Sequence, residues 1–188
     1  EKYLSSSDRI KLLSLLSKYL LGSYPEVVIY EKEREKILSE ILDVTIYRDI
    51  VERYSVKNLK ALRLTITGVA NSPYFSVHKF SNYLNSLGIR VSKNTIYAYL
   101  EYLSDSMILY QLRKFSKSYK KIYQTVPKLY FVDNGFLLIQ GIEDIGRFME
   151  GVVFVEFIRK GLKTNRDLFY YRSNGYEVDF LIKNGKGV

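Results

Sequence analysis

Hydrophobic residues recur every three or four positions over the first part of the chain, a spacing that predicts helices. In residues 7–22 the predicted cap is Ser7 or Asp8 and the predicted stop is Gly22, around an apolar stripe of Ile10, Leu13, Leu16, Leu20 and Leu21. Residues 31–54 predict a longer helix with an inward face of Ile37, Ile41, Val44 and Ile50. We therefore expect a helical N-terminal segment over residues 1–54.

The middle of the chain predicts a helix-turn-helix. One helix is expected before the Asn-Ser-Pro break at residues 71–73. A second begins after Ser76, ends at Gly88 and buries Phe80, Leu84 and Leu87, and a third begins after Ser92 and buries Ile96, Leu100 and Leu103. Only "GIRV" separates the last two helices, which is typical of this motif.

A strand pattern follows the third helix. Residues 108–112 are expected to pair with a return strand, placed either near Tyr123 or at residues 129–132, around the basic turn "RKFSKSYKK". Three helices and a basic hairpin indicate a winged helix-turn-helix, assigned to residues 55–125.

The last part, residues 126–188, mixes helix and strand. "VDNG" at residues 132–135 indicates a turn. "GRFMEGVVFVEFIRKGL" predicts a helix, with an inward face of Phe148, Val152, Val155 or Phe154, and Ile158. "LFYYRS" and "YEVDFLIK" predict two strands joined by a turn at residues 173–175. The predicted fold class is α+β, with a helical segment, a winged helix and a partial α/β unit.

Composition narrows the classes of function. The 188 residues have a formal net charge of +9 and a pI near 9.5, which favours a polyanionic partner, nucleic acid first. With no cysteine and one histidine, thiol catalysis, histidine triads and multi-histidine zinc sites are excluded. No apolar run approaches the ~20 residues that span a bilayer, and the N-terminus does not have the shape of a signal peptide. We expect a cytoplasmic protein without a membrane partner.

Six stretches occur in a fixed order: "YLLGSYPEVV", "LDVTIYRDIVERYSV", "SKNTIYAYLEYLSDSMILYQL", "PKLYFVDNGF", "MEGVVFVEFIR" and "YYRSNGYEVDFLI". This series resembles the C-terminal half of a family of prokaryotic, largely archaeal, AAA-type P-loop ATPases. In that family a winged helix and a restriction-endonuclease-like tail follow the ATPase core. The chain departs from the family pattern at Gly151, where an asparagine is usual. It also contains no G-x-x-x-x-G-K-[ST] loop and ends before a (D/E)-x-K strand.

The resemblance implies a fragment of a larger protein. ATP and Mg²⁺ would be cofactors of the parent ATPase, and no cofactor is expected within these 188 residues. The implied protein partners are the ATPase domain of the same protein or sister subunits.

Candidate nucleic-acid contacts lie on the third helix and the basic turn. If Ile96, Leu100 and Leu103 are buried, Lys93, Asn94 and Tyr97 face outward near the start of a recognition helix. Asn94 could read adenine, and Lys93 could contact a phosphate or guanine. Thr95 could contact a phosphate or form a local hydrogen bond within the protein. The turn adds five cations that could follow a backbone: Arg113, Lys114, Lys117, Lys120 and Lys121. Two alternatives stay open, a protein-interaction module and a free-standing transcription regulator.

Candidate catalytic residues lie in the tail. Glu177 and Asp179 are two residues apart on a predicted strand and so share a face. By resemblance, Asp179 matches the strand aspartate of the nuclease-like site, a possible Mg²⁺ ligand, and Glu150 matches the acid of the preceding helix. Lys183 follows on the same strand, so it is not the lysine of the next strand, and "KNGKGV" predicts the next turn. The alternative is an acid pair neutralised by Arg172. We expect no cleavage activity from these residues.

Overall fold

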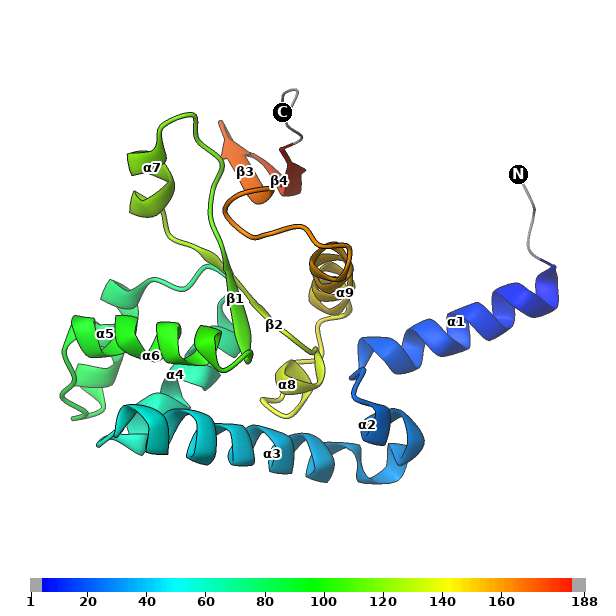
Figure 1. Ribbon diagram of the computed structural model, residues 1–188, viewed down its shortest axis with the longest axis horizontal. Coiled ribbons are helices and arrows are strands. Elements are labelled where there is room, and N and C mark those ends of the chain that lie inside the picture. Colours follow the sequence, from blue (N-terminus) through cyan, green and yellow to red (C-terminus); the bar gives the residue numbers. More distant parts are fainter. Residues whose placement is uncertain (1–4, 184–188) are drawn as a thin grey trace.

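The computed structural model describes residues 5–183. The chain is α+β, mostly helical with two small antiparallel sheets (Figure 1). The helices of the N-terminal part are α1 (Ser6–Leu20), α2 (Pro25–Ile29), η1 (Glu31–Glu33), α3 (Arg34–Val44) and η2 (Thr45–Glu52). The middle contains α4 (Leu59–Asn71), α5 (Val77–Ser86), α6 (Lys93–Asp105), β1 (Leu109–Leu112), α7 (Tyr119–Gln124) and β2 (Lys128–Phe131). The tail contains α8 (Gly135–Leu138), α9 (Ile145–Arg159), β3 (Leu168–Ser173) and β4 (Tyr176–Ile182).

The first helix extends away from the rest of the molecule (Figure 1). Its cap is Ser5, whose Oγ accepts the Asp8 amide, and the prediction of Ser7 or Asp8 as cap was wrong. No residue of α1 is buried, and Ile10 and Leu13 are 69% and 64% exposed, so their apolar stripe does not face a core within residues 5–183. The end of α1 is held by the Tyr19 hydroxyl, which donates to Glu156 of α9 at 3.0 Å.

The helix predicted over residues 31–54 runs without interruption but changes from an α-helix to a π-helix along its length. It begins as α3 and continues as the π-helix η2, whose wider turns contain more than four residues. The buried stripe is Leu38, Leu42, Ile46 and Ile50. Val44, predicted to face inward, is 56% exposed, because buried residues recur every four positions through α3 and η2, and Val44 lies midway between Leu42 and Ile46 on the opposite side of the helix.

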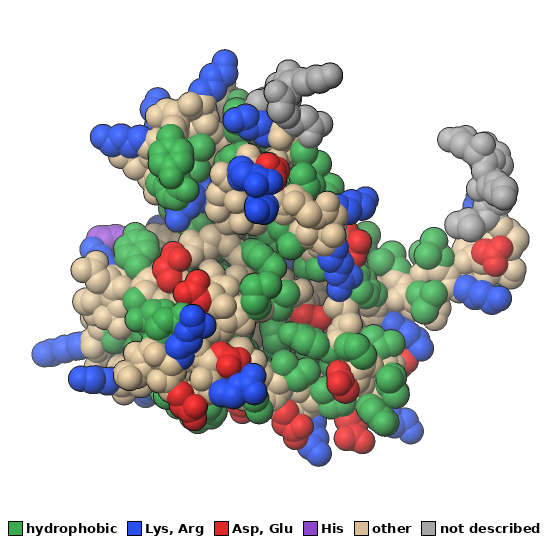
Figure 2. Space-filling model, viewed as in Figure 1, with side chains coloured by type: hydrophobic (Ala, Val, Ile, Leu, Met, Phe, Trp, Pro, Cys, Tyr) green, Lys and Arg blue, Asp and Glu red, His purple; other side chains and the backbone are tan. Residues whose placement is uncertain are grey.

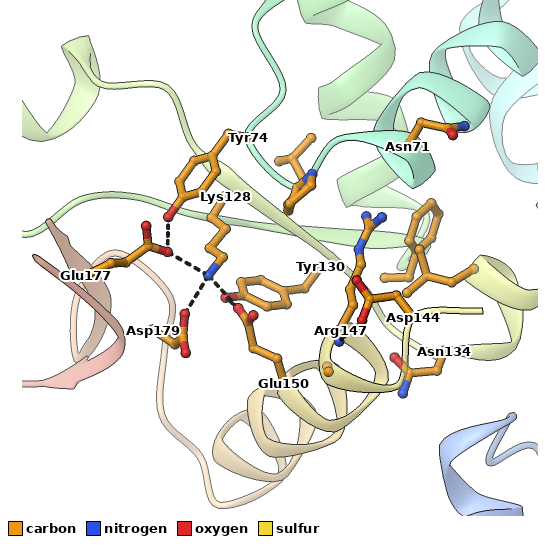
Figure 3. A pocket seen from close by; sticks show the side chains of 16 residues that line it. Asn71, Tyr74, Lys128, Tyr130, Asn134, Asp144, Arg147, Glu150, Glu177 and Asp179 are labelled. Carbon is orange, nitrogen blue, oxygen red and sulfur yellow. Dashed lines mark hydrogen bonds and ion pairs between the residues drawn. The ribbon is translucent and has the colours of Figure 1, made fainter. Parts of the chain in front are cut away.

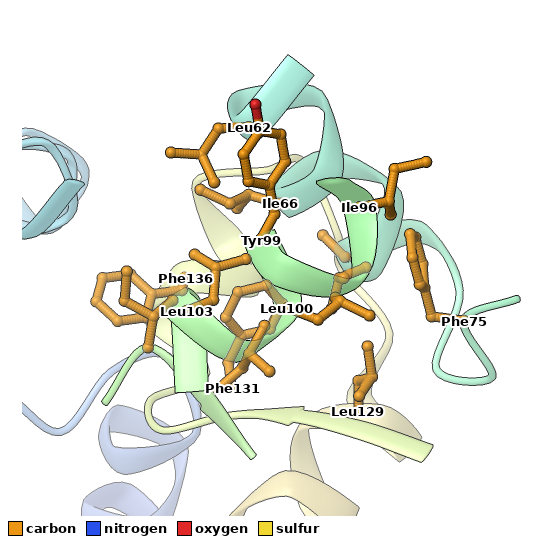
Figure 4. Close-up of a cluster of buried hydrophobic side chains, with 14 of the residues drawn as sticks. Leu62, Ile66, Phe75, Ile96, Tyr99, Leu100, Leu103, Leu129, Phe131 and Phe136 are labelled. Carbon is orange, nitrogen blue, oxygen red and sulfur yellow. The ribbon is translucent and has the colours of Figure 1, made fainter. Parts of the chain in front are cut away.

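The three helices of the predicted helix-turn-helix are confirmed as helices α4, α5 and α6. Both serine caps are present, with Ser76 Oγ accepting the Lys79 amide and Ser92 Oγ accepting the Thr95 amide. The inward face of α6 packs into the main core with β2 and Phe136 (Figure 4). One expectation was wrong: Leu87 is 50% exposed, because α5 ends at Ser86 and the chain turns there.

β1 pairs antiparallel with β2, from Leu109 opposite Phe131 to Leu112 opposite Lys128. The later of the two predicted return strands is therefore the one that forms. The basic segment between the strands is not a simple turn, since α7 occupies residues 119–124. The hairpin also crosses the predicted boundary between residues 125 and 126, so the middle and the tail share it.

In the tail, β3 and β4 form the predicted hairpin. Its turn residues Asn174 and Gly175 have φ of 48° and 84°, the positive values that a short hairpin turn requires. β3 also bonds to the segment after β1: the Phe115 amide donates to Tyr170 O at 2.7 Å. On α9 the buried residues are Phe148, Gly151 and Phe154, whereas Val152, Val155 and Ile158 are half-buried. A second core of Leu112, Tyr130, Phe154, Leu168 and Tyr170 joins this tail to the β1–β2 hairpin.

Across residues 5–183 the helices include none with both the length and the apolar character needed to span a bilayer.

Candidate functional site

A buried lysine lies at the junction of the middle and the tail. Lys128 is the first residue of β2, and its side chain is only 4% exposed. On this strand Leu129 and Phe131 face the main core, while Tyr130, two residues after Lys128, belongs to the tail core. The side-chain alternation of a strand therefore directs Lys128 towards the tail.

Three carboxylates surround the Lys128 ammonium (Figure 3). Its Nζ lies 2.6 Å from Glu150 Oε1, 3.1 Å from Glu177 Oε1 and 2.7 Å from Asp179 Oδ1. Glu150 comes from α9, and the other two acids come from β4, where their two-residue spacing places them on one face. The four groups lie in a pocket of about 470 Å³ that also contains Arg147 and Asp144. The fold thus brings together the predicted acids Glu150 and Asp179.

Two tyrosine hydroxyls complete the cluster. Tyr74 donates to Glu177, and Tyr130 donates to Glu150. Burial, together with these hydrogen bonds to carboxylates, raises the pKa of both phenols above the ordinary value of 10.0. Both hydroxyls therefore remain protonated at neutral pH and act as donors.

The contacts within the cluster favour the ionised forms of Lys128 and Glu177. Burial alone would lower the pKa of Lys128, but hydrogen bonds to Asp179 and Glu150 outweigh burial, and the pKa is raised. For Glu177, burial raises the pKa, whereas the hydrogen bonds from Tyr74 and Lys128 lower it, with a net decrease. At neutral pH Lys128 is therefore an ammonium and Glu177 a carboxylate.

This arrangement differs from the predicted acid pair. Arg172, the expected cation, reaches Glu177 only at 3.9 Å, so Lys128 is the principal partner of both acids. Within residues 5–183 no group of three or more His, Cys, Asp or Glu side chains is arranged to hold a metal ion. The turn predicted for "KNGKGV" falls on residues 184–188, outside the described residues.

Gly151 gives α9 its close approach to the turn after β2. A Cβ at position 151 would lie 2.3 Å from Asn134 Oδ1. Asn134 is buried, and its Nδ2 donates to Phe148 O at 2.7 Å. Glu150 precedes Gly151, so this packing fixes the position of Glu150 over Lys128.

Asp133 has a structural role that the sequence did not indicate beyond a turn. It is 4% exposed and accepts the amide and the hydroxyl of Ser23, each at 2.7 Å, as well as the Gly135 amide at 2.7 Å. The carboxylate therefore joins the segment after α1 to the turn after β2, two stretches 110 residues apart.

The predicted nucleic-acid contacts lie on one side of the molecule. Lys93, Asn94 and Tyr97 are exposed at the start of α6, and Thr95, half-buried, bonds to the Ser92 cap. Lys117, Lys120 and Lys121 are exposed in or near α7, whereas Arg113 lies over the Tyr123 ring and Lys114 is half-buried beside β3. Helices α5, α6 and α7 all lie at the left of Figure 1, where Figure 2 shows projecting Lys and Arg side chains.

Sequence reasoning missed Lys128, Tyr74 and Tyr130. The signal was present in "PKLYF", where Lys128 and Tyr130 alternate with Leu129 and Phe131. A charged residue next to an apolar alternation is either at the end of a strand or buried with a partner. Two of the partners of Lys128, Glu177 and Asp179, come from residues about 50 positions further along, and this pairing depends on the fold.

Comparison with known proteins places the chain in a family. The model described as "Domain of unknown function (DUF8612)" matches residues 13–144, and the chain belongs to this family. An uncharacterized protein of Methanocaldococcus jannaschii is 35% identical over 188 residues, covering 97% of this chain and 42% of the relative. An uncharacterized protein of Haemophilus influenzae is 30% identical over 191 residues, covering 97% of this chain and 46% of the relative. The chain thus spans less than half the length of these relatives. No solved structure matches the chain.

Proposed function

We propose that this chain is a nucleic-acid-binding part of a larger P-loop ATPase, and that it binds through α6 and the basic segment 113–121. The observation that supports the binding surface is the division of α6 into two faces. Ile96, Leu100 and Leu103 are buried, and this leaves Lys93, Asn94 and Tyr97 exposed at the capped start of the helix. The start of a recognition helix is the part that reaches base edges.

In this proposal α4, α5, α6 and the β1–β2 hairpin form a winged helix, with α7 inside the wing. Lys117, Lys120 and Lys121 then contact phosphates, which position a protein on nucleic acid without reading its sequence. The net charge of +9 agrees with such a partner. ATP and Mg²⁺ would bind to the parent protein outside this chain, and the greater length of both relatives leaves room for that domain.

The experiment is a binding titration with labelled duplex and single-stranded DNA at a series of salt concentrations. We expect an affinity that falls steeply with salt, and a flatter dependence for the K120E/K121E variant, since each lost phosphate contact lowers the slope by about 1. The matched control is K32E/K36E, which changes the net charge equally at exposed positions of η1 and α3. Absence of binding at the lowest salt, or equal effects of both variants, would contradict the proposed surface.

A second proposal concerns the tail, because one observation favours it: a lysine from β2 neutralises the carboxylates. We propose that α9, β3 and β4 form a restriction-endonuclease-like unit that does not cleave nucleic acid in this chain. Lys128 places its charge where a divalent cation would need to enter among Glu150 and Asp179. Incubation of this chain with plasmid DNA and Mg²⁺ or Mn²⁺ should leave the DNA intact. Cleavage that disappears in both E150Q and D179N would overturn this proposal.

A further inference from the structure

A groove runs beside α6, away from the carboxylate cluster. It is lined by the loop from Tyr54 to Asn58, which precedes α4, and by the turn from Arg90 to Ser92, which precedes α6. The side of α6 that bears Asn94, Ala98 and Tyr102 completes the lining. The groove has a volume of about 580 Å³ and is open to solvent along its length.

The ionic side chains that line the groove are all cationic. Lys57 comes from the loop before α4 and Arg90 from the turn before α6, and the lining contains no carboxylate. Both side chains are exposed, and within residues 5–183 neither has a carboxylate within salt-bridge distance. Two uncompensated cations that line the same groove favour the binding of an anion there. An arginine is also suited to phosphate, because its planar guanidinium can donate two parallel hydrogen bonds.

The rest of the lining suits the less polar parts of a nucleotide. Val56, Val91 and Ala98 are apolar, and the half-buried Tyr102 adds an aromatic ring, whereas Tyr99 is 4% exposed and belongs to the core. The Tyr102 ring stacks on Tyr54 at 3.8 Å with an angle of 11°. The Tyr54 hydroxyl donates to Asp105 at 2.9 Å, which fixes this end of the groove. Grooves that follow a nucleic-acid strand combine cations with such aromatic surfaces.

The groove is continuous with the proposed binding face of α6. Asn94 lines the groove and also belongs to the exposed start of the helix. A strand that lies in the groove therefore passes Asn94 directly. We propose that this groove binds the sugar–phosphate backbone of one nucleic-acid strand, with Lys57 and Arg90 contacting its phosphates. This inference rests on the proposed function and adds to it a second phosphate-binding surface, separate from α7.

The test compares K57E/R90E with the control K32E/K36E in the same duplex and single-strand titrations. Both double variants change the net charge by the same amount at exposed lysine or arginine positions. We expect K57E/R90E to weaken binding about 10-fold or more beyond the control, and to lower the salt slope by about 2, one for each lost phosphate contact. Equal affinity and equal salt slope in the two variants would contradict the proposal that this groove binds nucleic acid.

A labelling experiment locates the strand without charge reversal. The chain contains no cysteine, so S55C, at the rim of the groove, introduces a single thiol. We expect saturating DNA to slow the reaction of this thiol with a disulfide reagent about 10-fold, while the thiol of S39C on α3 reacts at an unchanged rate. Binding that is weakened by K120E/K121E but leaves Cys-labelling at position 55 unprotected would overturn the groove and preserve the proposed function. Failure of the unmodified chain to bind DNA would overturn both.

Discussion

The Nζ atom of Lys128 lies 2.7 Å from Oδ1 of Asp179, across 51 residues of sequence, and this contact connects the β1–β2 hairpin to the last strand of the tail. The lysine is buried, whereas the Asp179 side chain is 53% exposed. The contact therefore joins a buried cation to a carboxylate that is still partly in contact with water. We expect the loss of Lys128 to lower the free energy of unfolding more than the loss of any single acid, because Lys128 contacts all three acids.

Replacement of Lys128 by Met should destabilise the chain. K128M leaves Glu150, Glu177 and Asp179 close together without a cation, and we expect a loss of roughly 1–3 kcal/mol, below the range for a fully buried pair because the acids keep contact with water. Urea unfolding followed by circular dichroism measures this loss. K183M, which removes an exposed lysine at the end of β4, is the matched control and should change the free energy of unfolding little. In the K128M background, D179N should recover part of the loss, and a further decrease would contradict the like-charge explanation.

Acid should weaken the same contacts. The pKa of Glu177 is lowered from its ordinary 4.5, so its stabilising contribution is fully present above that value and is lost as the pH falls through the lowered pKa. The raised pKa of Lys128 affects stability at high pH. The stabilising contribution of Lys128 is present below the ordinary pKa of 10.5 and is lost only as the pH rises through the raised value. Unfolding free energies from neutral pH to about pH 3 should therefore fall less steeply for E177Q than for the unmodified chain. Parallel curves would show that Glu177 does not couple its proton to folding.

Gly151 should resist substitution by alanine. The new Cβ would meet the buried Asn134 oxygen, so α9 or the turn after β2 has to move, and we expect a loss of about 1–3 kcal/mol. G146A, in the exposed first turn of α9, is the control and should change stability little, since the helix preference of alanine offsets a contact of 3.3 Å between its Cβ and Oδ1 of the exposed Asp144. Thermal unfolding of both variants measures the difference. A neutral G151A would mean that Asn134 can rotate away without loss.

Replacement of Asp133 should lower the free energy of unfolding more than replacement of its partner Ser23. D133A removes the acceptor of three hydrogen bonds at a buried position, and we expect a loss of about 2–4 kcal/mol. S23A removes only the hydroxyl donor and should cost about 1 kcal/mol. Limited proteolysis then reports on the segment before α2, which D133A should expose to cleavage at a lower protease concentration. Equal stability of the two variants would exclude Asp133 as the central acceptor.

Lys93 and Asn94 should affect binding in different ways. If Lys93 contacts a phosphate, K93A lowers the salt slope by about 1 and weakens all sequences equally. If Asn94 contacts a base edge, N94A leaves the salt slope unchanged and reduces discrimination between sequences by about 1–3 kcal/mol. Selection from a randomised duplex pool, followed by salt titration of the selected site, separates the two effects. Identical behaviour of the two variants would contradict the distinct contacts expected of these residues.

Local chemistry made much of the fold predictable. The caps at Ser76 and Ser92, the buried face of α6 and the turn at Asn174 and Gly175 all depend on residues within a few positions of one another. The common face of Glu177 and Asp179 follows from the two-residue repeat of a strand in the same way. These elements need no knowledge of what packs on them.

The remaining features depend on distant contacts. The buried face of α3 and η2 depends on the surface that Leu38 and Ile46 pack on; helical spacing placed Ile50 correctly but chose Ile37 and Ile41 in place of the neighbouring Leu38 and Leu42, and Val44 in place of Ile46. The exposure of Ile10 and Leu13 cannot be inferred from an apolar stripe, which looks the same whether or not a core faces it. Lys128 was missed for a similar reason, because its partners lie in the tail and only the fold brings them to it.

The register of the β1–β2 hairpin has a mechanical consequence. Lys128, which holds the acids of α9 and β4, is paired through the backbone with Leu112, and β1 begins four residues after the end of α6. The acids of the tail are therefore held by a strand that is paired, residue for residue, with the strand leaving α6. The β1–β2 hairpin is thus the covalent and hydrogen-bonded connection between the carboxylate cluster and the end of α6.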